Sequence, residues 1–139
     1  MKIGNKRRWG LIAAGVLCAG CMLYYGIEVV AARIKTPQIV QGILQSDVVV
    51  LRLNELSPRQ IEILLTVEDP QFYHHKGVDL RTPGAGLTTI TQSLVKKLYF
   101  REFKPGIRKI KQTLIVRYAL DPLIPKDDQL LMFINMHYR

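Results

Sequence analysis

Two adjacent acids and two adjacent histidines lie within one stretch, VEDPQFYHHKGVD, at positions 67–79. Glu68 follows Ile61 by seven residues and Leu64 by four, so on a helix it would continue an apolar stripe. An ionised carboxylate is costly to bury and rarely lies on a core face without a partner. The position therefore predicts a working carboxylate at Glu68, and a solvated acid at a helix end is the alternative.

The histidines of this stretch raise the question of a metal site. His74 and His75 could join Asp79 as ligands, but adjacent side chains point in different directions and nothing nearby supplies further ligands at a metal-site spacing. We therefore predict no dedicated metal site. Asp69 is interpreted as a structural hydrogen-bonder rather than a second base.

Helices are expected on both sides of this stretch. Ser57 and Pro58 have the residue types of a helix N-cap and first helical position. Residues 70–86 contain several prolines and glycines and predict a loop. Apolar residues four apart predict a helix over about 90–100, with a start at 88–89.

A dense basic cluster follows, with eight basic residues and only one acid between Lys96 and Arg117. A helix is predicted from Ile107 to about Leu120, and Arg108 and Lys109 fall in its first turn, against the helix dipole. Such cations suit a bound diphosphate or an anionic lipid surface. The helix is expected to end at Asp121–Pro122, and a fourth helix to begin at Pro125–Asp127.

The N-terminal region predicts a membrane anchor. Residues 9–27 carry no charge, and a run of this length is about long enough to cross a bilayer as a helix. Basic residues precede the run, so the N-terminus is expected in the cytoplasm and the body outside, where nucleic acid is not a partner. The alternatives are a buried helix and a lipoprotein signal ending at Cys21. Both cysteines lie in the run, which excludes a disulfide framework in the body.

The segment after the anchor predicts a connector and a strand. Residues 33–46 are read as a juxtamembrane connector broken at Pro37 and Gly42. Residues 47–53, DVVVLRL, are apolar and β-branched and predict a short strand. The expected domains are therefore residues 1–32 as basic tip and anchor, 33–56 as connector and 57–139 as the helical body.

Four short patterns resemble the motifs of the family 51 glycosyltransferases, which polymerise peptidoglycan. The first is the Glu68–Asp79 pattern, ED-x-x-F-x-x-H-x-GVD, and the second is GLTTITQSL at 86–94. The third is RKIKQ at 108–112, and the fourth runs from Lys126 to Asn135. The resemblance covers about residues 60–139. It implies a mainly α fold, with a single transmembrane helix followed by a lysozyme-like glycosyltransferase domain.

The resemblance implies an activity and a set of site residues. Lipid II would be polymerised into glycan strands by an inverting reaction that releases polyprenyl diphosphate, with Glu68 as general base. No cofactor is required, although a divalent cation at the diphosphate fits the chemistry. The implied catalytic positions are Glu68 and Gln112, and the implied substrate-binding positions are Asp69, His75, Thr89, Gln92, Lys96, Arg108, Lys109 and Lys126. The location would be the bacterial cytoplasmic membrane, and other wall-synthesis proteins are potential partners.

Two departures from the family pattern support a hypothesis other than catalysis. Gln112 stands where the family has a second catalytic glutamate, and Ser93 and Leu87 replace a glutamine and a glycine. Family domains also continue well beyond the fourth motif, so we expect the C-terminal part of the domain to be missing. The second hypothesis is thus a non-catalytic lipid II binding module or degenerate remnant. A third is a basic protein that docks on anionic lipids through residues 96–117.

Overall fold

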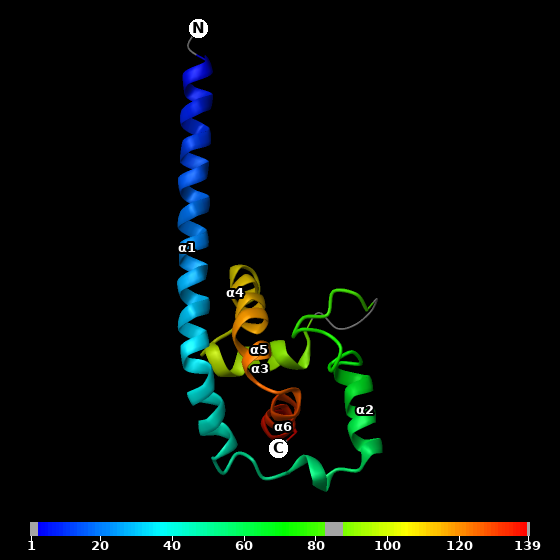
Figure 1. The fold of residues 1–139 in the computed structure, drawn as a ribbon. Coiled ribbons are helices and arrows are strands. Elements are labelled where there is room, and N and C mark those ends of the chain that lie inside the picture. The colour runs from blue at the N-terminus through cyan, green and yellow to red at the C-terminus, as the bar shows by residue number, and fades with distance from the viewer. Residues whose placement is uncertain (1–2, 83–87, 139) are drawn as a thin grey trace.

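The computed structural model describes residues 3–82 and 88–138, and among these residues it contains helices and no strand. One long helix, α1 (Ile3–Leu44), stands beside a small body formed by all the later helices (Figure 1). The predicted mainly α-helical class, with one long apolar N-terminal helix, is confirmed.

The length of α1 exceeds what a bilayer needs. Its 42 residues extend for about 60 Å at about 1.5 Å per residue, roughly twice the thickness of a bilayer core. The helix is apolar enough to cross a membrane, and its most apolar window is not buried by the body. The C-terminal part packs on the body through Ala32, Thr36 and Val40, which are buried and lie four residues apart.

The predicted break of this segment at Pro37 and Gly42 is wrong, because α1 continues through both residues to Leu44. A proline inside a helix costs about 3 kcal/mol. Here Thr36 and Val40, on either side of Pro37, are buried against the body, and the Thr36 hydroxyl shares a hydrogen bond with the hydroxyl of Tyr99. Packing against the body therefore stabilises a helix that the local sequence disfavours.

The predicted strand over 47–53 is also wrong. These residues form turns and extended chain leading into a short 3₁₀ turn, η1 (Leu53–Glu55). The side chain of Asn135 takes the place of a neighbouring strand: its Oδ1 accepts from the amides of Val50 and Leu51 at 2.9 Å, and its Nδ2 donates to the Leu51 carbonyl at 2.8 Å. One amide side chain thus satisfies backbone groups that a sheet would otherwise pair.

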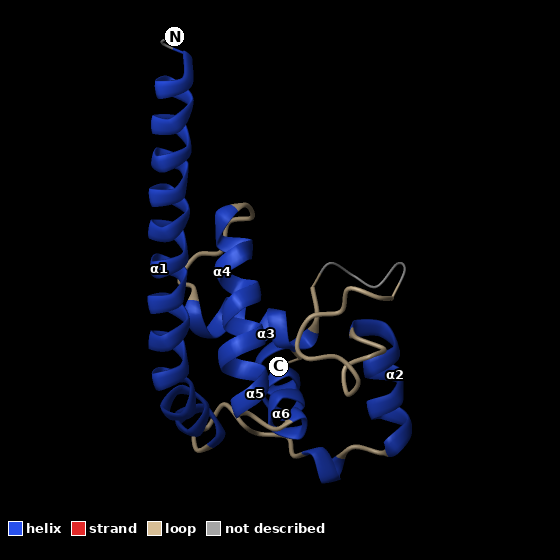
Figure 2. Ribbon diagram, turned by 45° about the horizontal axis from the view of Figure 1, so that its top comes forward, coloured by secondary structure: helices blue, strands red, loops and turns tan. Residues whose placement is uncertain are grey.

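The predicted helix that carries Glu68 is α2 (Pro58–Glu68). Ser57 caps it as expected, accepting from the Gln60 amide while the Gln60 side chain accepts from the Ser57 amide. None of its residues is buried, although Ile61 and Leu64 pack against the core from one side. Figures 1 and 2 show α2 on the far side of the body from α1.

The remaining helices enclose the core. They are α3 (Ile90–Tyr99), α4 (Ile107–Ile115), the π-helical segment η2 (Val116–Leu120), α5 (Asp121–Leu123) and α6 (Lys126–His137). Phe72, Leu94, Leu120 and Leu130 are among its fully buried side chains. The predicted helix starts at Thr89, Ile107 and Lys126 are confirmed.

The helix expected to end at Asp121–Pro122 instead continues through Pro122 to Leu123. Proline cannot donate to the carbonyl four residues earlier, which belongs to Tyr118. The guanidinium of Arg33 donates to that carbonyl at 2.7 Å. A side chain of α1 therefore satisfies the group that the proline leaves unpaired, and the same bond fixes α1 to η2.

Gly77 provides a test of this packing. Its φ is +79°, and a Cβ there would lie 2.5 Å from Val116 Cγ1. We expect Gly77→Ala to lower the free energy of unfolding by about 2–4 kcal/mol, from backbone strain plus overpacking. Gly106 also has a positive φ, +107°, but a Cβ there meets nothing within 4 Å. Gly106→Ala, which introduces backbone strain without overpacking, is the matched control and should cost less than Gly77→Ala in denaturant unfolding. Equal losses would contradict the packing argument.

Candidate functional site

Glu68 lies at the C-terminal end of α2 and is half-buried. The hydroxyl of Tyr138, just after α6, donates a hydrogen bond to Glu68 Oε1. This bond, with burial second, raises the pKa of Tyr138 to about 12. The candidate base is therefore held by a phenol that arrives from seventy residues along the chain. No local pattern in the sequence points to Tyr138, because its contact with Glu68 depends on how α6 folds back.

Asp69, the residue next to Glu68, joins three segments. It is 4% exposed and caps the C-terminus of α2. Its carboxylate accepts from His75 Nε2, at 2.9 and 3.0 Å from the two oxygens, and from the amide of Ile90 at 3.0 Å. The amide of Ile90 opens α3, so a negative charge there also suits the helix dipole. The interpretation of Asp69 as a structural hydrogen-bonder agrees with this geometry.

The start of α3 is closed by a capping box. Thr89 Oγ1 accepts from the Gln92 amide, and Gln92 Oε1 accepts from the Thr89 amide, both at 3.1 Å. The Thr89 hydroxyl also donates to the Gly77 carbonyl at 2.6 Å. Thr89 and Gln92 are buried, as is most of the His75 ring. The structure thus brings together four residues predicted to bind substrate, Asp69, His75, Thr89 and Gln92, in one internal network, and their contact with substrate stays a prediction.

Gln112 is fully buried between α3 and α4. Its Nε2 donates to the backbone carbonyl of Gln92 at 2.7 Å, and its Oε1 has no hydrogen-bond partner among the described residues. An amide fits this position because it supplies a donor to the carbonyl. A carboxylate would turn an acceptor toward the same carbonyl.

The predicted cations fall into two groups. The pKa of Lys109, in α4, is lowered first by burial and second by repulsion from Lys96 of α3. Lys96 Nζ also lies 5.2 Å from the centre of the Phe103 ring. Two neighbouring lysines that repel one another favour an anion nearby, because an anion would relieve their repulsion.

The two remaining predicted cations, Arg108 and Lys126, also have partners within the fold. Arg108 donates to the Glu102 carbonyl. Lys126 pairs with Asp121 at 2.7 Å and lies 4.5 Å from the centre of the Phe72 ring. The ion pair and the aromatic face hold Lys126 within the body rather than leaving it in solvent.

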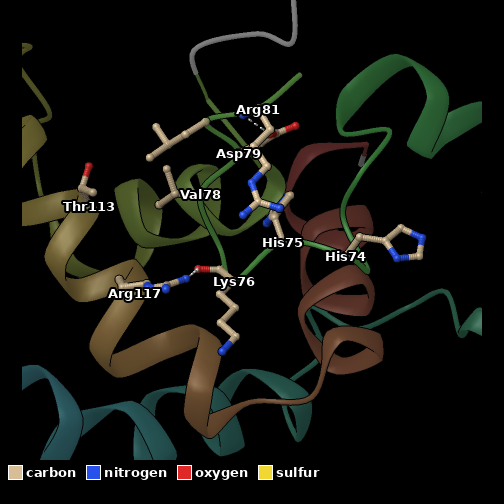
Figure 3. Close-up of a pocket in the computed structure, with 9 residues that line it drawn as sticks. His74, His75, Lys76, Val78, Asp79, Arg81, Thr113 and Arg117 are labelled. Carbon is tan, nitrogen blue, oxygen red and sulfur yellow. Dashed lines mark hydrogen bonds between the residues drawn. The ribbon is translucent and has the colours of Figure 1, made fainter. Parts of the chain in front are cut away.

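A cavity of about 640 Å³ lies beside this network (Figure 3). The loop after α2 forms most of its lining, and Thr113 and Arg117 line it from α4 and η2. His75 is the one residue of the predicted site that lines it. From the sequence, Arg117 is only one member of the general basic cluster, and no pattern singles out Arg81. The sequence separation of Arg81 and Arg117 does not indicate that both side chains line the same cavity.

We expect Gln112→Glu to destabilise the body by about 2–4 kcal/mol, because it buries a carboxylate against the Gln92 carbonyl. Denaturant unfolding at pH 7 would measure the loss. Gln45→Glu, at an exposed position, is the matched control and should change stability by less than about 0.5 kcal/mol. Unchanged stability of Gln112→Glu would show that this position tolerates the charge.

The bond between Tyr138 and Glu68 predicts a shift in phenol titration. Subtracting the ultraviolet titration of Tyr138→Phe from that of the intact chain isolates Tyr138, whose pKa should be about 12. In Glu68→Ala it should fall toward the ordinary value of about 10. Since the folded pKa is the higher one, the bond contributes stability below about pH 10, which is lost as pH rises through about 12. Glu62→Ala, on the same helix, should leave the titration unchanged. A Tyr138 pKa that does not depend on Glu68 would contradict the contact.

Comparison with known proteins shows the family to which this chain belongs. The family described as Transglycosylase matches residues 36–139. Penicillin-binding protein 1F of Bacillus subtilis is 31% identical over 99 residues, which cover 62% of this chain and 14% of that protein. Penicillin-binding protein 1A of Escherichia coli is 27% identical over 99 residues, with 62% and 12% covered. Penicillin-binding protein 1A of Haemophilus influenzae is 26% identical over 137 residues, with 86% and 16% covered. The chain thus spans less than a fifth of each of these relatives, and by its match over residues 36–139 it belongs to the transglycosylase family.

Proposed function

We propose that this chain is a peptidoglycan glycosyltransferase that polymerises lipid II into glycan strands at the outer face of the bacterial cytoplasmic membrane. The observation that carries the proposal is the position of Glu68, at the end of α2 and beside the Asp69 network, in a chain that belongs to the transglycosylase family. The mutually repelling lysines Lys96 and Lys109 on the same body would add cations for the diphosphate.

Glu68 is the general base of the proposed reaction. Its Oε1 is engaged by Tyr138, so we assign Oε2 to the hydroxyl of the acceptor sugar. As the hydroxyl oxygen attacks the anomeric carbon of the growing chain, its proton passes to Glu68. The new glycosidic bond forms while the bond from the anomeric carbon to the diphosphate oxygen breaks on the opposite face. The configuration at that carbon is therefore inverted.

The leaving group departs as polyprenyl diphosphate, and its charge needs cations. Lys96 and Lys109 would stabilise it, since their mutual repulsion falls when an anion lies between them. Arg108, exposed in the first turn of α4, is the next cation available to the diphosphate. The proposal requires no cofactor of the protein's own, and a divalent cation bound to the diphosphate would enter as part of the substrate.

The apolar surface of the molecule supports a membrane location. Beyond the apolar length of α1, two large side chains of α4 face solvent: Ile107 is 76% exposed and Ile110 is 51% exposed. An apolar groove lined by residues of α1 together with Leu114 and Tyr118 runs between the two elements. This surface would rest in lipid, where the polyprenyl tail of the substrate also lies. Basic residues before the apolar run favour a cytoplasmic N-terminus.

The second candidate is a membrane-anchored module that binds lipid II without turning it over. The specific observation in its favour is Gln112, which is buried and hydrogen-bonded to α3 rather than offering a carboxylate. Under this alternative the cationic pair would still bind the diphosphate. Other wall-synthesis proteins would then supply the catalysis, and they are proposed partners in either case.

Labelled lipid II in detergent tests the first candidate. The intact chain should form glycan polymer, and Glu68→Gln should lower the rate by about 10²-fold or more, since it removes the base. Glu62→Gln, an exposed position on the same helix, is the matched control and should keep the rate.

Binding of lipid II, measured in the same detergent, separates the two candidates. Binding without polymer from a folded preparation would support the non-catalytic module. A Glu68→Gln variant that polymerises at the rate of the intact chain would overturn the assignment of the base.

A further inference from the structure

The cavity between the loop after α2 and the helix α4–η2 carries none of the cations assigned to the diphosphate. Three other cationic side chains line it, Lys76, Arg81 and Arg117, against one carboxylate, that of Asp79. Figure 3 shows Arg117 reaching from the helix toward the backbone of Lys76, to whose carbonyl it donates at 3.4 Å. The cavity therefore has a positive rim that the transglycosylase reaction does not use.

The walls of this cavity are fixed by close packing. Gly77 lies so near Val116 that a Cβ would not fit between them. Asp79 Oδ1 accepts from the amides of Arg81 and Thr82 at 2.8 and 3.1 Å, which shapes the loop that carries Arg81. The cavity is thus defined by the backbone before any ligand enters.

One buried polar atom at the cavity lacks a partner. The side chain of His75 is 8% exposed, and Nε2 donates to Asp69. Because a carboxylate only accepts, Nε2 carries a hydrogen, and in the neutral ring Nδ1 is then an acceptor. Nδ1 has no hydrogen-bond partner among the described residues, and His75 lines the cavity. A buried acceptor of this kind indicates a hydrogen donor on whatever occupies the space.

Asp79 adds a second acceptor. Its hydrogen bonds with the Thr82 side chain and the Arg81 amide lower its pKa, so the carboxylate is ionised at neutral pH. The cavity therefore offers acceptors at His75 and Asp79 and cations at its rim. A metal ion fits poorly beside three cationic side chains, and a bare anion gives the acceptors little to bind. A ligand that carries both an anionic group and hydroxyl groups satisfies both sets.

We propose that this cavity binds the phosphate ester of a sugar or polyol. Arg81 and Arg117 would take the phosphate oxygens, and His75 Nδ1 and Asp79 would accept from the hydroxyls. The cavity volume of about 640 Å³ suits a small molecule of this class. The site does not depend on polymerisation, since it uses neither Glu68 nor the lysine pair.

Two sources could supply this chemistry, a free sugar phosphate and the head group of a membrane phospholipid. The second is within reach because Arg33 of α1 donates to the carbonyl of Tyr118, the neighbour of Arg117. That bond places η2 beside the part of α1 that follows the apolar run. Glucose 1-phosphate probes the first source, and nanodiscs of phosphatidylglycerol, compared with phosphatidylcholine, probe the second.

The test uses the full chain in detergent or nanodiscs, with calorimetry for affinity. The double variant Arg81→Gln/Arg117→Gln should bind the effective probe at least tenfold more weakly. Arg59→Gln/Arg101→Gln, two exposed arginines outside the cavity, is the matched control and should bind as the intact chain does. Circular dichroism checks that each variant is folded. Glu68→Gln should bind normally, so loss of polymerase activity and loss of this site are told apart.

A second readout follows the histidine itself. Nitrogen resonances of the three histidines, assigned with His74→Asn and His137→Asn, should show a shift confined to His75 Nδ1 when the probe binds. Binding of glucose 1-phosphate alone, or of phosphatidylglycerol alone, with these effects supports the site and identifies its source. The proposal is overturned by three results: no binding of either probe, equal binding by the cavity double variant and the control, or inorganic phosphate binding as tightly as glucose 1-phosphate.

Discussion

The carboxylate of Asp69 is the interaction on which the arrangement of the site depends. It ends α2, accepts from the first amide of α3 and holds the ring of His75. Because it is almost fully buried, any change that removes a donor would leave a charge without compensation. Glu68 is the next residue in the chain, so the position of the candidate base follows from the bonds of its neighbour. The lining of the nearby cavity depends on the same bonds, through His75.

A second constraint comes from α1, which is more than an anchor. The ion pair between Glu28 and Lys111, at 2.6 Å, and the bond from Arg33 to the Tyr118 carbonyl both join α1 to α4 and η2. These two contacts hold the apolar residues of α4 beside the part of α1 where its apolar run ends. Under the proposed function, a domain joined in this way to its long apolar helix would keep a fixed height and orientation over the lipid that holds its substrate.

The polar residues of the body divide into those used inside the fold and those left for a ligand. Gln92, Gln112 and Lys126 each make a contact inside the fold, although they lie in patterns that resemble substrate-binding motifs, and Oε1 of the Gln112 amide has no hydrogen-bond partner among the described residues. The buried Nδ1 of His75 also has no hydrogen-bond partner among the described residues, so its environment is incomplete. Incomplete environments of this kind point to ligands more directly than residue type does.

Local chemistry in the sequence determined most helix starts, because caps and turns depend on neighbouring residues. Ser57 with Pro58, and Thr89 with Gln92, act within one turn of chain and could be read directly. The order of the four motifs likewise predicted the family and the mainly α class. Charge and apolar length predicted the N-terminal helix.

Tertiary structure decided what depends on partners far along the chain. Asn135 replaced a strand partner for Val50 and Leu51, and Arg33 allowed the helix to pass Pro122. The hydrogen bonds from Tyr138 to Glu68 and from Arg117 to the loop after α2 likewise join residues that lie far apart in the sequence. The local propensity of a segment to form a helix or a strand is worth at most a few kcal/mol, and burial together with well-placed hydrogen bonds outweighs it. Such contacts exist only once the helices have packed, and for that reason only the folded chain shows them.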